Sequence, residues 1–337
     1  MTIGHPPIPP FVTASPASIT IDLDNLWSYL KTQGLSGWED YPSYLPVVVP
    51  QILDALSRHK VTATFFIVGR DATRSENKAP LQAIADAGHE ISCHSFDHEP
   101  CLHLYSESEL NTEFDRAEEA IEAATGARPR GFRGPGFSCS DDVRHCLVSR
   151  GYTYDSSSFP TFLGPLARLY FHFSAKLPKE ERQRRSGLYG GIKQGFATLR
   201  PHRLESGLVE FPVTTMPMAR VPMHQTYLLF LAQRSLPLAR LFWGVAHGAC
   251  SLVSLPPTLL LHPTDFLDLD DVPAMSFFPG MKLPRSKKIE LIDVVLGSVT
   301  SRHPVAPLNQ RAAAMVRDPK TAVSAFPVSN SNLSPQP

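Results

Sequence analysis

An α/β fold with mostly parallel strands is predicted by the way two kinds of segment alternate along this chain. Short apolar runs rich in β-branched and aromatic residues are followed, one after another, by longer segments with helix start and stop signals. The 337 residues are enough to bury a large core in one barrel-type domain.

The strand predictions rest on β-branched content and on alternation. Residues 18–24 alternate between apolar and polar side chains, as expected for a strand with two different faces. Residues 61–68 form an uninterrupted apolar run closed by Gly69, which is typical of a buried strand. Shorter runs of the same kind predict further strands at 90–93, 131–133, 152–155, 208–213 and 258–261.

The helix predictions rest on capping residues and glycine stops. The strongest spans residues 106–124, where Ser106 and Glu109 resemble a capping box and Gly126 follows the last turn. Residues 80–87 are predicted to form a short helix ended by Gly88. The patterns at 45–59 and 141–150 predict two more helices.

Composition divides the chain into three parts. Residues 1–17 read as an irregular, proline-marked lead-in, and residues 18–303 as one barrel-type domain. The stretch of about 160–257 is longer than a strand–helix–strand unit needs and is interpreted as an insertion before the last strand. Residues 304–337 are rich in Pro, Ser, Asn and Ala, which predicts a disordered tail.

Charge and cysteine usage narrow the function classes. Lys and Arg number 32, as do Asp and Glu, so a nucleic-acid partner is not expected. Five cysteines without framework spacing do not indicate a disulfide scaffold. The N-terminal residues lack the basic and apolar regions of a signal peptide, so we expect a cytoplasmic protein.

One segment carries an excess of positive charge. Between Pro160 and Glu210 there are nine basic and four acidic residues, a net charge of +5, and apolar runs lie nearby at 159–173 and 227–242. A solvated helical face is the plainest interpretation. The same pattern also fits peripheral contact with the inner face of an anionic membrane, or a homo-oligomer interface.

Two local patterns carry the chemistry. His94 and His98 are four residues apart, which on a helical turn would let both imidazoles reach one metal ion. Asp22 and Asp24 are two residues apart at the end of a predicted strand, so their carboxylates project to one face. Carboxylates at the carboxyl ends of strands occupy the position where α/β barrels gather catalytic groups.

With these residues the sequence resembles the polysaccharide deacetylase family (the NodB homology domain), in a branch with Asp-x-Asp spacing. The resemblance spans roughly residues 18–300 and includes five ordered motifs. They are Ile21-Asp22-Leu23-Asp24-Asn25, His94-Ser95-Phe96-Asp97-His98, Arg133-Gly134-Pro135, Asp155-Ser156-Ser157 and Leu259-Leu260-Leu261-His262-Pro263. The resemblance implies a distorted (β/α)7-type barrel.

The resemblance also implies a role for each motif. Asp24, His94 and His98 would hold a divalent metal ion, Zn²⁺ above others, with a position left open for water. Asp22 would be the catalytic base and His262 the acid that protonates the leaving amine. Arg133 would hold Asp22 ionised and oriented, and Asp155 would orient the acid histidine.

The reaction implied is metal-dependent removal of an N-acetyl or other N-acyl group from an amino sugar. The expected substrate is carried on a lipid or a nucleotide. Two other functions stay open. The Asp-x-Asp spacing is similar to that of allantoinase-like cyclic amide and imide hydrolases, and a non-catalytic sugar-binding protein would need one of these residues to have lost its role.

Overall fold

Seven parallel strands form the centre of the molecule. The computed structural model describes residues 15–164, 177–178, 180, 192–318 and 323–324. In the order β8-β1-β2-β3-β4-β5-β7, every neighbouring pair of strands is parallel. Their bounds are β1 Ser18–Asp22, β2 Thr64–Ile67, β3 Glu90–Cys93, β4 Gly131–Phe132, β5 Tyr154–Asp155, β7 Val209–Glu210 and β8 Thr258–Leu261.

The two outer strands of this parallel set approach each other. Thr214, four residues after β7, donates its main-chain N–H to the carbonyl of Thr258 in β8 at 3.0 Å. The N–H of Thr258 in turn donates to Oγ1 of Thr214 at 2.8 Å. These bonds close the sheet on itself, which confirms the predicted distorted barrel of seven parallel strands. Two further strands extend the sheet beyond β7: β6, His202–Leu204, is antiparallel to β7, and β9, Val323–Ser324, is parallel to β6.

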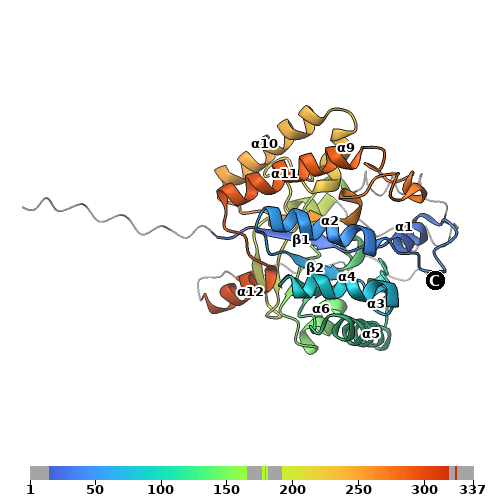
Figure 1. The fold of residues 1–337 in the computed structure, drawn as a ribbon. Helices are drawn as coiled ribbons and strands as arrows, with labels where there is room; N and C mark the ends of the chain where they lie inside the picture. The colour runs from blue at the N-terminus through green and yellow to red at the C-terminus, as the bar shows by residue number, and fades with distance from the viewer. Residues whose placement is uncertain (1–14, 165–176, 179, 181–191, 319–322, 325–337) are drawn as a thin grey trace, which may run out of the picture.

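Helices surround the strands (Figure 1). In this view α2, α9, α10 and α11 lie in the upper half and α3, α4, α5 and α6 in the lower half, and α2 packs on α4. The bounds are α1 Leu26–Gln33, α2 Leu45–Arg58, α3 Gly69–Ala72, α4 Ser75–Asp86, α5 Glu107–Thr125, α6 Asp141–Ser149, α9 Gln225–Ala232, α10 Leu236–Leu252, α11 Arg285–Arg302 and α12 Leu308–Arg317. Short 3₁₀ turns lie at Leu102–Leu104, Pro135–Phe137, Ile192–Phe196, Pro263–Asp265 and Pro273–Met275.

The local signals in the sequence explain where several helices begin and end. The Ser106 hydroxyl accepts from the N–H of Glu109, and the Glu109 carboxylate accepts from the N–H of Ser106, so α5 has the predicted capping box. Gly126 ends α5 at φ 72°, in the left-handed region that glycine adopts without strain. By contrast, α4 begins at Ser75, five residues before the predicted start, and Pro80 lies inside it.

The prediction of disorder from residue 304 onward is wrong for the residues that form α12. Leu308 and Ala312 are fully buried or nearly so, packed with Tyr154, Val209 and Phe211. Pro307 is the N-cap of the helix, and N–H groups of its first turn donate to buried groups of the barrel. Leu308 donates to Oγ1 of Thr64 and Asn309 to the Glu90 carboxylate. Residues 308–317 are themselves rich in Ala, Arg, Leu and Met, which favour a helix, and burial against the barrel stabilises it.

The segment of about 160–257 is not a simple insertion, because it contains β7, one of the seven parallel strands. Six of the nine basic residues between Pro160 and Glu210 lie at 165–176, 179 and 181–191, outside the described residues. Its described remainder includes α9 and α10, which pack against each other and against the face of the barrel that carries β8. Among the described helices, none combines the length and the apolarity needed to cross a membrane.

Candidate active site

Strand register brings the predicted site residues to one end of the barrel. Ile21 lies opposite Leu261, so Asp22 and His262 follow the paired residues of two adjacent strands. Cys93 lies opposite Phe132, so His94 and Arg133 likewise follow the paired residues of β3 and β4. Because parallel strands present their carboxyl ends at one edge, these four side chains gather there, where α/β barrels carry their reactive groups.

Arg133 and Asp22 form a buried ion pair at the centre of this end. Nη1 of Arg133 lies 2.6 Å from Oδ1 of Asp22, and the guanidinium is fully shielded from solvent. The other donors of Arg133 reach Oγ1 of Thr20 at 3.0 Å, and the carbonyl and hydroxyl of Ser156 at 2.9 and 2.7 Å. The Phe66 ring lies under the guanidinium, 4.3 Å from its centre. Each nitrogen of the guanidinium therefore has an acceptor, which fixes the orientation of Arg133 and, through the ion pair, that of the Asp22 carboxylate.

Asp24, His94 and His98 form a second cluster next to this pair. Oδ1 of Asp24 lies 2.9 Å from Nε2 of His98 and 3.3 Å from Nε2 of His94. One ligand atom from each of the three residues lies within 4.8 Å of the others, and no other group of this kind occurs among the described residues. Burial by itself would raise the pKa of Asp24, but the charge and hydrogen bond of His98, with those of His94, hold it well below its usual value.

Local geometry orients both imidazoles. Nδ1 of His94 lies 2.6 Å from the carbonyl oxygen of Arg133, so Nδ1 donates to that carbonyl and Nε2 faces Asp24. Nδ1 of His98 is buried and has no hydrogen-bond partner among the described residues. The pair does not lie on a helical turn, which corrects the geometry expected from the four-residue spacing. Residues 94–98 form a loop after β3 in which Ser95 and His98 have φ values of 60° and 48°.

A carboxylate from α5 supports this loop. Oε1 of Glu113 accepts the N–H groups of Phe96 at 2.8 Å and Asp97 at 2.9 Å. These bonds satisfy two main-chain donors that a helical turn would otherwise pair, and they fix the loop in the conformation that turns His98 toward Asp24. Glu113 gave no signal in the sequence, because its role depends on packing of α5 beside the loop.

A network below the first strand fixes the chain after Asp24. Oδ1 of Asp71 accepts from Nδ2 of Asn25 at 2.8 Å and from Nε1 of Trp27 at 2.9 Å. Oδ1 of Asn25 accepts the N–H groups of Leu26 and Tyr44. Burial raises the pKa of Asp71 to about 7, although the hydrogen bonds from Asn25 and Trp27 oppose the shift. Trp27 is thereby buried in the network and packs the loop against the barrel.

His262 follows β8 and is oriented by two residues that sequence reasoning missed. Nδ1 of His262 lies 3.0 Å from Oγ1 of Thr226, and that hydroxyl donates to Oδ1 of Asp265 at 2.9 Å. Oδ2 of Asp265 also accepts the N–H of His262 at 2.8 Å. Because the Thr226 proton goes to Asp265, Nδ1 of His262 is the donor to Thr226 and Nε2 is left to face the site. The only available signal was the spacing His262-Pro263-Thr264-Asp265, which is that of a capped helical turn.

Asp155 is not the residue that orients His262, which corrects the expectation for the fourth motif. It lies level with Phe132, which packs on Phe114 of α5 outside the barrel. Successive residues of a strand alternate between faces, so Asp155 points toward the helices while Tyr154 points into the barrel. There Oδ1 of Asp155 accepts from the hydroxyl of Ser157 at 2.5 Å, and Oδ2 lies 4.0 Å from Nε of Arg144 on α6.

Comparison with known proteins agrees with this geometry. Residues 36–154 match the family model described as polysaccharide deacetylase. This part of the chain is therefore similar to the polysaccharide deacetylase family. The matched residues include His94, His98 and Arg133, while the aspartate pair and His262 lie outside the match. In the structure, strand register and direct contacts bring Asp22, Asp24 and His262 to the same end of the barrel as the matched residues.

Among curated relatives, the peptidoglycan deacetylase of Helicobacter pylori is 28% identical over 145 residues, which cover 41% of this chain and 47% of the relative. The chitooligosaccharide deacetylase of Sinorhizobium fredii is 32% identical over 133 residues, 36% of this chain and 60% of the relative. The chain thus spans about half the length of these polysaccharide deacetylase relatives. A solved structure from Mycobacterium smegmatis, assigned as a polysaccharide deacetylase, superposes with a TM-score of 0.58 at 21% identity. It covers 94% of this chain and 98% of that one, so the whole barrel has the fold of this structure.

The site fits the divalent metal ion that the polysaccharide deacetylase resemblance implies. Two imidazole nitrogens and one carboxylate oxygen are ligand types that zinc takes in catalytic sites. The tautomer of His94 leaves Nε2 free for such a bond, and the second nitrogen has the main-chain acceptor common behind metal-bound histidines. In the structure, ligand atoms of the three residues lie within 4.8 Å of one another, close enough to bind a single ion.

Proposed function

We propose that this protein hydrolyses the N-acetyl group of an amino sugar, with a Zn²⁺ ion held by Asp24, His94 and His98. The observation that carries the proposal is the convergence of these three residues with the Asp22–Arg133 pair at one end of the barrel. The names of the curated relatives, which include peptidoglycan and chitooligosaccharide deacetylases, support an N-acetylated amino sugar as the substrate class.

The roles of the residues follow from their contacts. The ion, when bound, would supply Lewis-acid polarisation of the amide carbonyl and would lower the pKa of a water molecule in its open position. Asp22 accepts the proton of the attacking water, and Arg133 keeps that carboxylate charged and pointed into the site. Nε2 of His262 donates a proton to the leaving nitrogen, which an amide requires because an amide anion leaves poorly. Thr226 and Asp265 hold His262 in the orientation for this transfer.

Two further parts of the proposal concern the form of the substrate and the compartment in which the reaction takes place. We propose an acceptor sugar attached to a lipid or nucleotide carrier, and a cytoplasmic location for the reaction. Comparing acetate release from free and carrier-linked N-acetyl sugars tests the first, and fractionation of cells that express the full-length protein tests the second. Equal rates on free and carrier-linked sugars would remove the carrier from the proposal.

The decisive experiment joins metal analysis with an activity screen. The purified protein should contain about one zinc ion per chain and release acetate from N-acetylglucosamine oligomers, and a chelator should remove both. Small ureides and cyclic imides should be tested in parallel, because the spacing of Asp22 and Asp24 is also that of cyclic amide hydrolases. Ring opening without acetate release would replace the deacetylase proposal with that activity. Sugar binding with neither reaction would leave a binding protein.

A further inference from the structure

The face of α10 that points away from the barrel is apolar. Leu238, Leu241, Val245 and Leu252 are 47, 65, 57 and 88% exposed. Their spacing of three, four and seven residues places them in one stripe along the helix. The opposite face is apolar too, because Ala239, Trp243, Ala246 and Cys250 are buried against the core. A helix that is apolar all round normally has a partner on both sides, and among the described residues the outer stripe has none.

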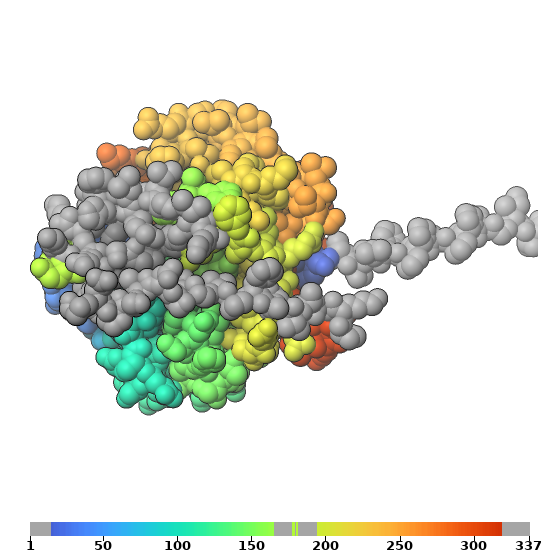
Figure 2. All heavy atoms as spheres, turned by 180° about the vertical axis from the view of Figure 1, so that it is seen from behind, coloured from blue at the N-terminus to red at the C-terminus, as the bar shows by residue number. Residues whose placement is uncertain are grey.

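The exposed apolar side chains are concentrated in this region. Of the thirteen large hydrophobic residues exposed in the described part of the chain, six lie between residues 230 and 253. Besides the four of the stripe, these are Phe230 on α9 and Val253 after α10. In Figure 2, α10 forms the upper rim of the molecule, which is a position open to a flat surface. A concentration of this kind marks an interaction site more often than scattered exposure does.

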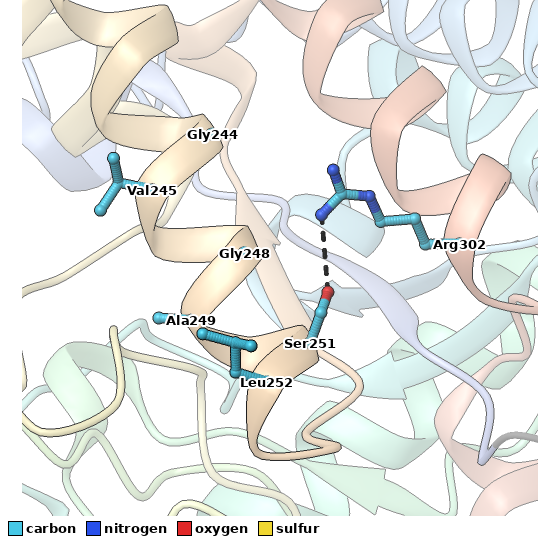
Figure 3. A pocket seen from close by; sticks show the side chains of 7 residues that line it. All are labelled: Gly244, Val245, Gly248, Ala249, Ser251, Leu252 and Arg302. Atoms are coloured by element: carbon cyan, nitrogen blue, oxygen red, sulfur yellow. Dashed lines mark hydrogen bonds between the residues drawn. The ribbon is translucent and has the colours of Figure 1, made fainter.

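A shallow pocket lies beside the stripe (Figure 3). It is lined by the backbone of Gly244 and Gly248 and by Val245, Ala249 and Leu252 on α10, with Arg302 of α11 on its rim. A Cβ atom at Gly244 or at Gly248 would meet no other atom within 4 Å, so the helix surface is open at these positions. Arg302 reaches across toward α10, where Nη1 lies 3.5 Å from the hydroxyl of Ser251.

The cations that flank the stripe without an ion-pair partner among the described residues give its ends a positive charge. Residues 211–264 contain three arginines and no aspartate or glutamate. Arg240 is paired with Glu290, whereas Arg234 and Arg302 form no ion pair with the described residues. Arg200 donates to the carbonyls of Val253 and Ser254 at the C-terminal end of α10, which places a third cation there. An apolar stripe with unpaired cations at both ends is complementary to a surface of anionic lipid.

We propose that the outer stripe of α10, defined as Leu238, Leu241, Val245 and Leu252, seats this protein on an anionic lipid surface. The helix lies in the plane of the interface, with the apolar stripe among the acyl chains and with Arg234 and Arg302 at the headgroup phosphates. A second copy of the chain fits less well. Packing α10 on its own copy would bring Arg234 and Arg302 of both chains together without an acidic partner.

This contact would place the active site near the lipid surface. Thr226, the hydroxyl that holds His262, lies in the first turn of α9, and exposed Phe230 follows one turn later, about 6 Å along the helix axis. Helices α9 and α10 pack against each other, so the stripe lies on the helix next to the one that carries Thr226. The contact itself does not depend on deacetylation, and its test does not require it.

Flotation of the full-length protein with lipid vesicles tests the contact. Vesicles of phosphatidylcholine mixed with phosphatidylglycerol should carry the protein upward at low salt, and vesicles of phosphatidylcholine alone should carry much less. Leu241→Ser and Val245→Ser should each lower the partition coefficient about five-fold, because each removes apolar surface from the lipid. Arg302→Gln should lower it by a similar factor, and high salt should weaken binding of the unmodified protein.

A matched variant controls for the loss of an exposed valine. Val316 on α12 is 50% exposed, and Val316→Ser should leave binding unchanged. Circular dichroism and the rate on a soluble substrate should be unchanged in all these variants, which separates the lipid contact from the catalytic proposal. Absence of flotation with both vesicle types would overturn the contact, as would equal effects of Val316→Ser and Val245→Ser. A stable dimer that Leu241→Ser and Val245→Ser dissociate would assign the stripe to a second copy.

Discussion

The main-chain carbonyl of Arg133 accepts the Nδ1–H of His94 at 2.6 Å, while the guanidinium of the same arginine binds Asp22 at 2.6 Å. One residue therefore orients a proposed metal ligand through its backbone and the proposed base through its side chain. The carbonyl does not depend on which side chain Arg133 carries. Substitutions at this end of the barrel can therefore separate metal binding from base function.

Asp22→Asn and Asp24→Asn should have different effects. Asp22→Asn removes the base but no metal ligand, so turnover should fall by roughly 10²–10⁴-fold at near-normal zinc content. Asp24→Asn should lose both zinc and activity. Zinc content by mass spectrometry and the rate of acetate release measure the two effects. Loss of zinc to the same extent in both variants would contradict separate roles.

His94→Ala and His98→Ala should each remove zinc and activity. Loss of groups behind metal ligands commonly costs about 10–100-fold in metal affinity or activity, and loss of a direct ligand should cost at least as much. His145→Ala on α6 is the control, because His145 is exposed and lies outside the cluster. A His98→Ala protein that kept full zinc occupancy and full rate would show that His98 is not a ligand.

Thr226→Val should slow turnover by about 10-fold or more while leaving zinc content normal, because His262 loses the hydroxyl that fixes its ring. Thr226→Ser keeps the hydroxyl and should recover most of the rate. Asp155→Asn should leave the fall in rate at alkaline pH (the alkaline limb of the pH–rate profile) unchanged. The reason is that Asp155 lies on the face of β5 that points toward the helices. A shift of that limb in Asp155→Asn but not in Thr226→Val would restore the expected role of Asp155.

The titration of Asp71 should lower the free energy of unfolding as the pH rises. Its pKa is raised to about 7 in the folded protein, so the folded state holds this proton more tightly than the unfolded state does. The contribution to stability is complete below about pH 4 and is lost as the pH rises to about 7. Asp71→Asn keeps an oxygen acceptor for Asn25 and Trp27 and removes the titration.

Chemical denaturation at two pH values measures this effect. Between about pH 5 and pH 8 the free energy of unfolding of the unmodified protein should fall by roughly 2 kcal/mol more than that of Asp71→Asn. The difference should be absent at lower pH, where Asp71 is protonated in both states. Parallel pH dependence in the two proteins would place the pKa of Asp71 near its ordinary value.

The sequence by itself determined the features that depend on neighbours in the chain. The capping box of Ser106 and Glu109 sets the start of α5 because its donors and acceptors are three residues apart. The two-residue spacing of Asp22 and Asp24 puts both carboxylates at the end of one strand. The alternation of strands and helices was sufficient to predict a parallel α/β fold, because short βα units build such sheets.

Tertiary structure decided every feature that joins distant residues. Asp265 and Thr226, 39 residues apart, hold His262 only because α9 packs against the end of β8. Asp155 faces the helices because strand register sets it level with Phe132. Residues 308–317 are helical because the barrel offers Thr64 and Glu90 as acceptors and an apolar surface for Leu308. Register and packing are global properties, since each strand is positioned by its neighbours in space, and local composition carries no record of which neighbours those are.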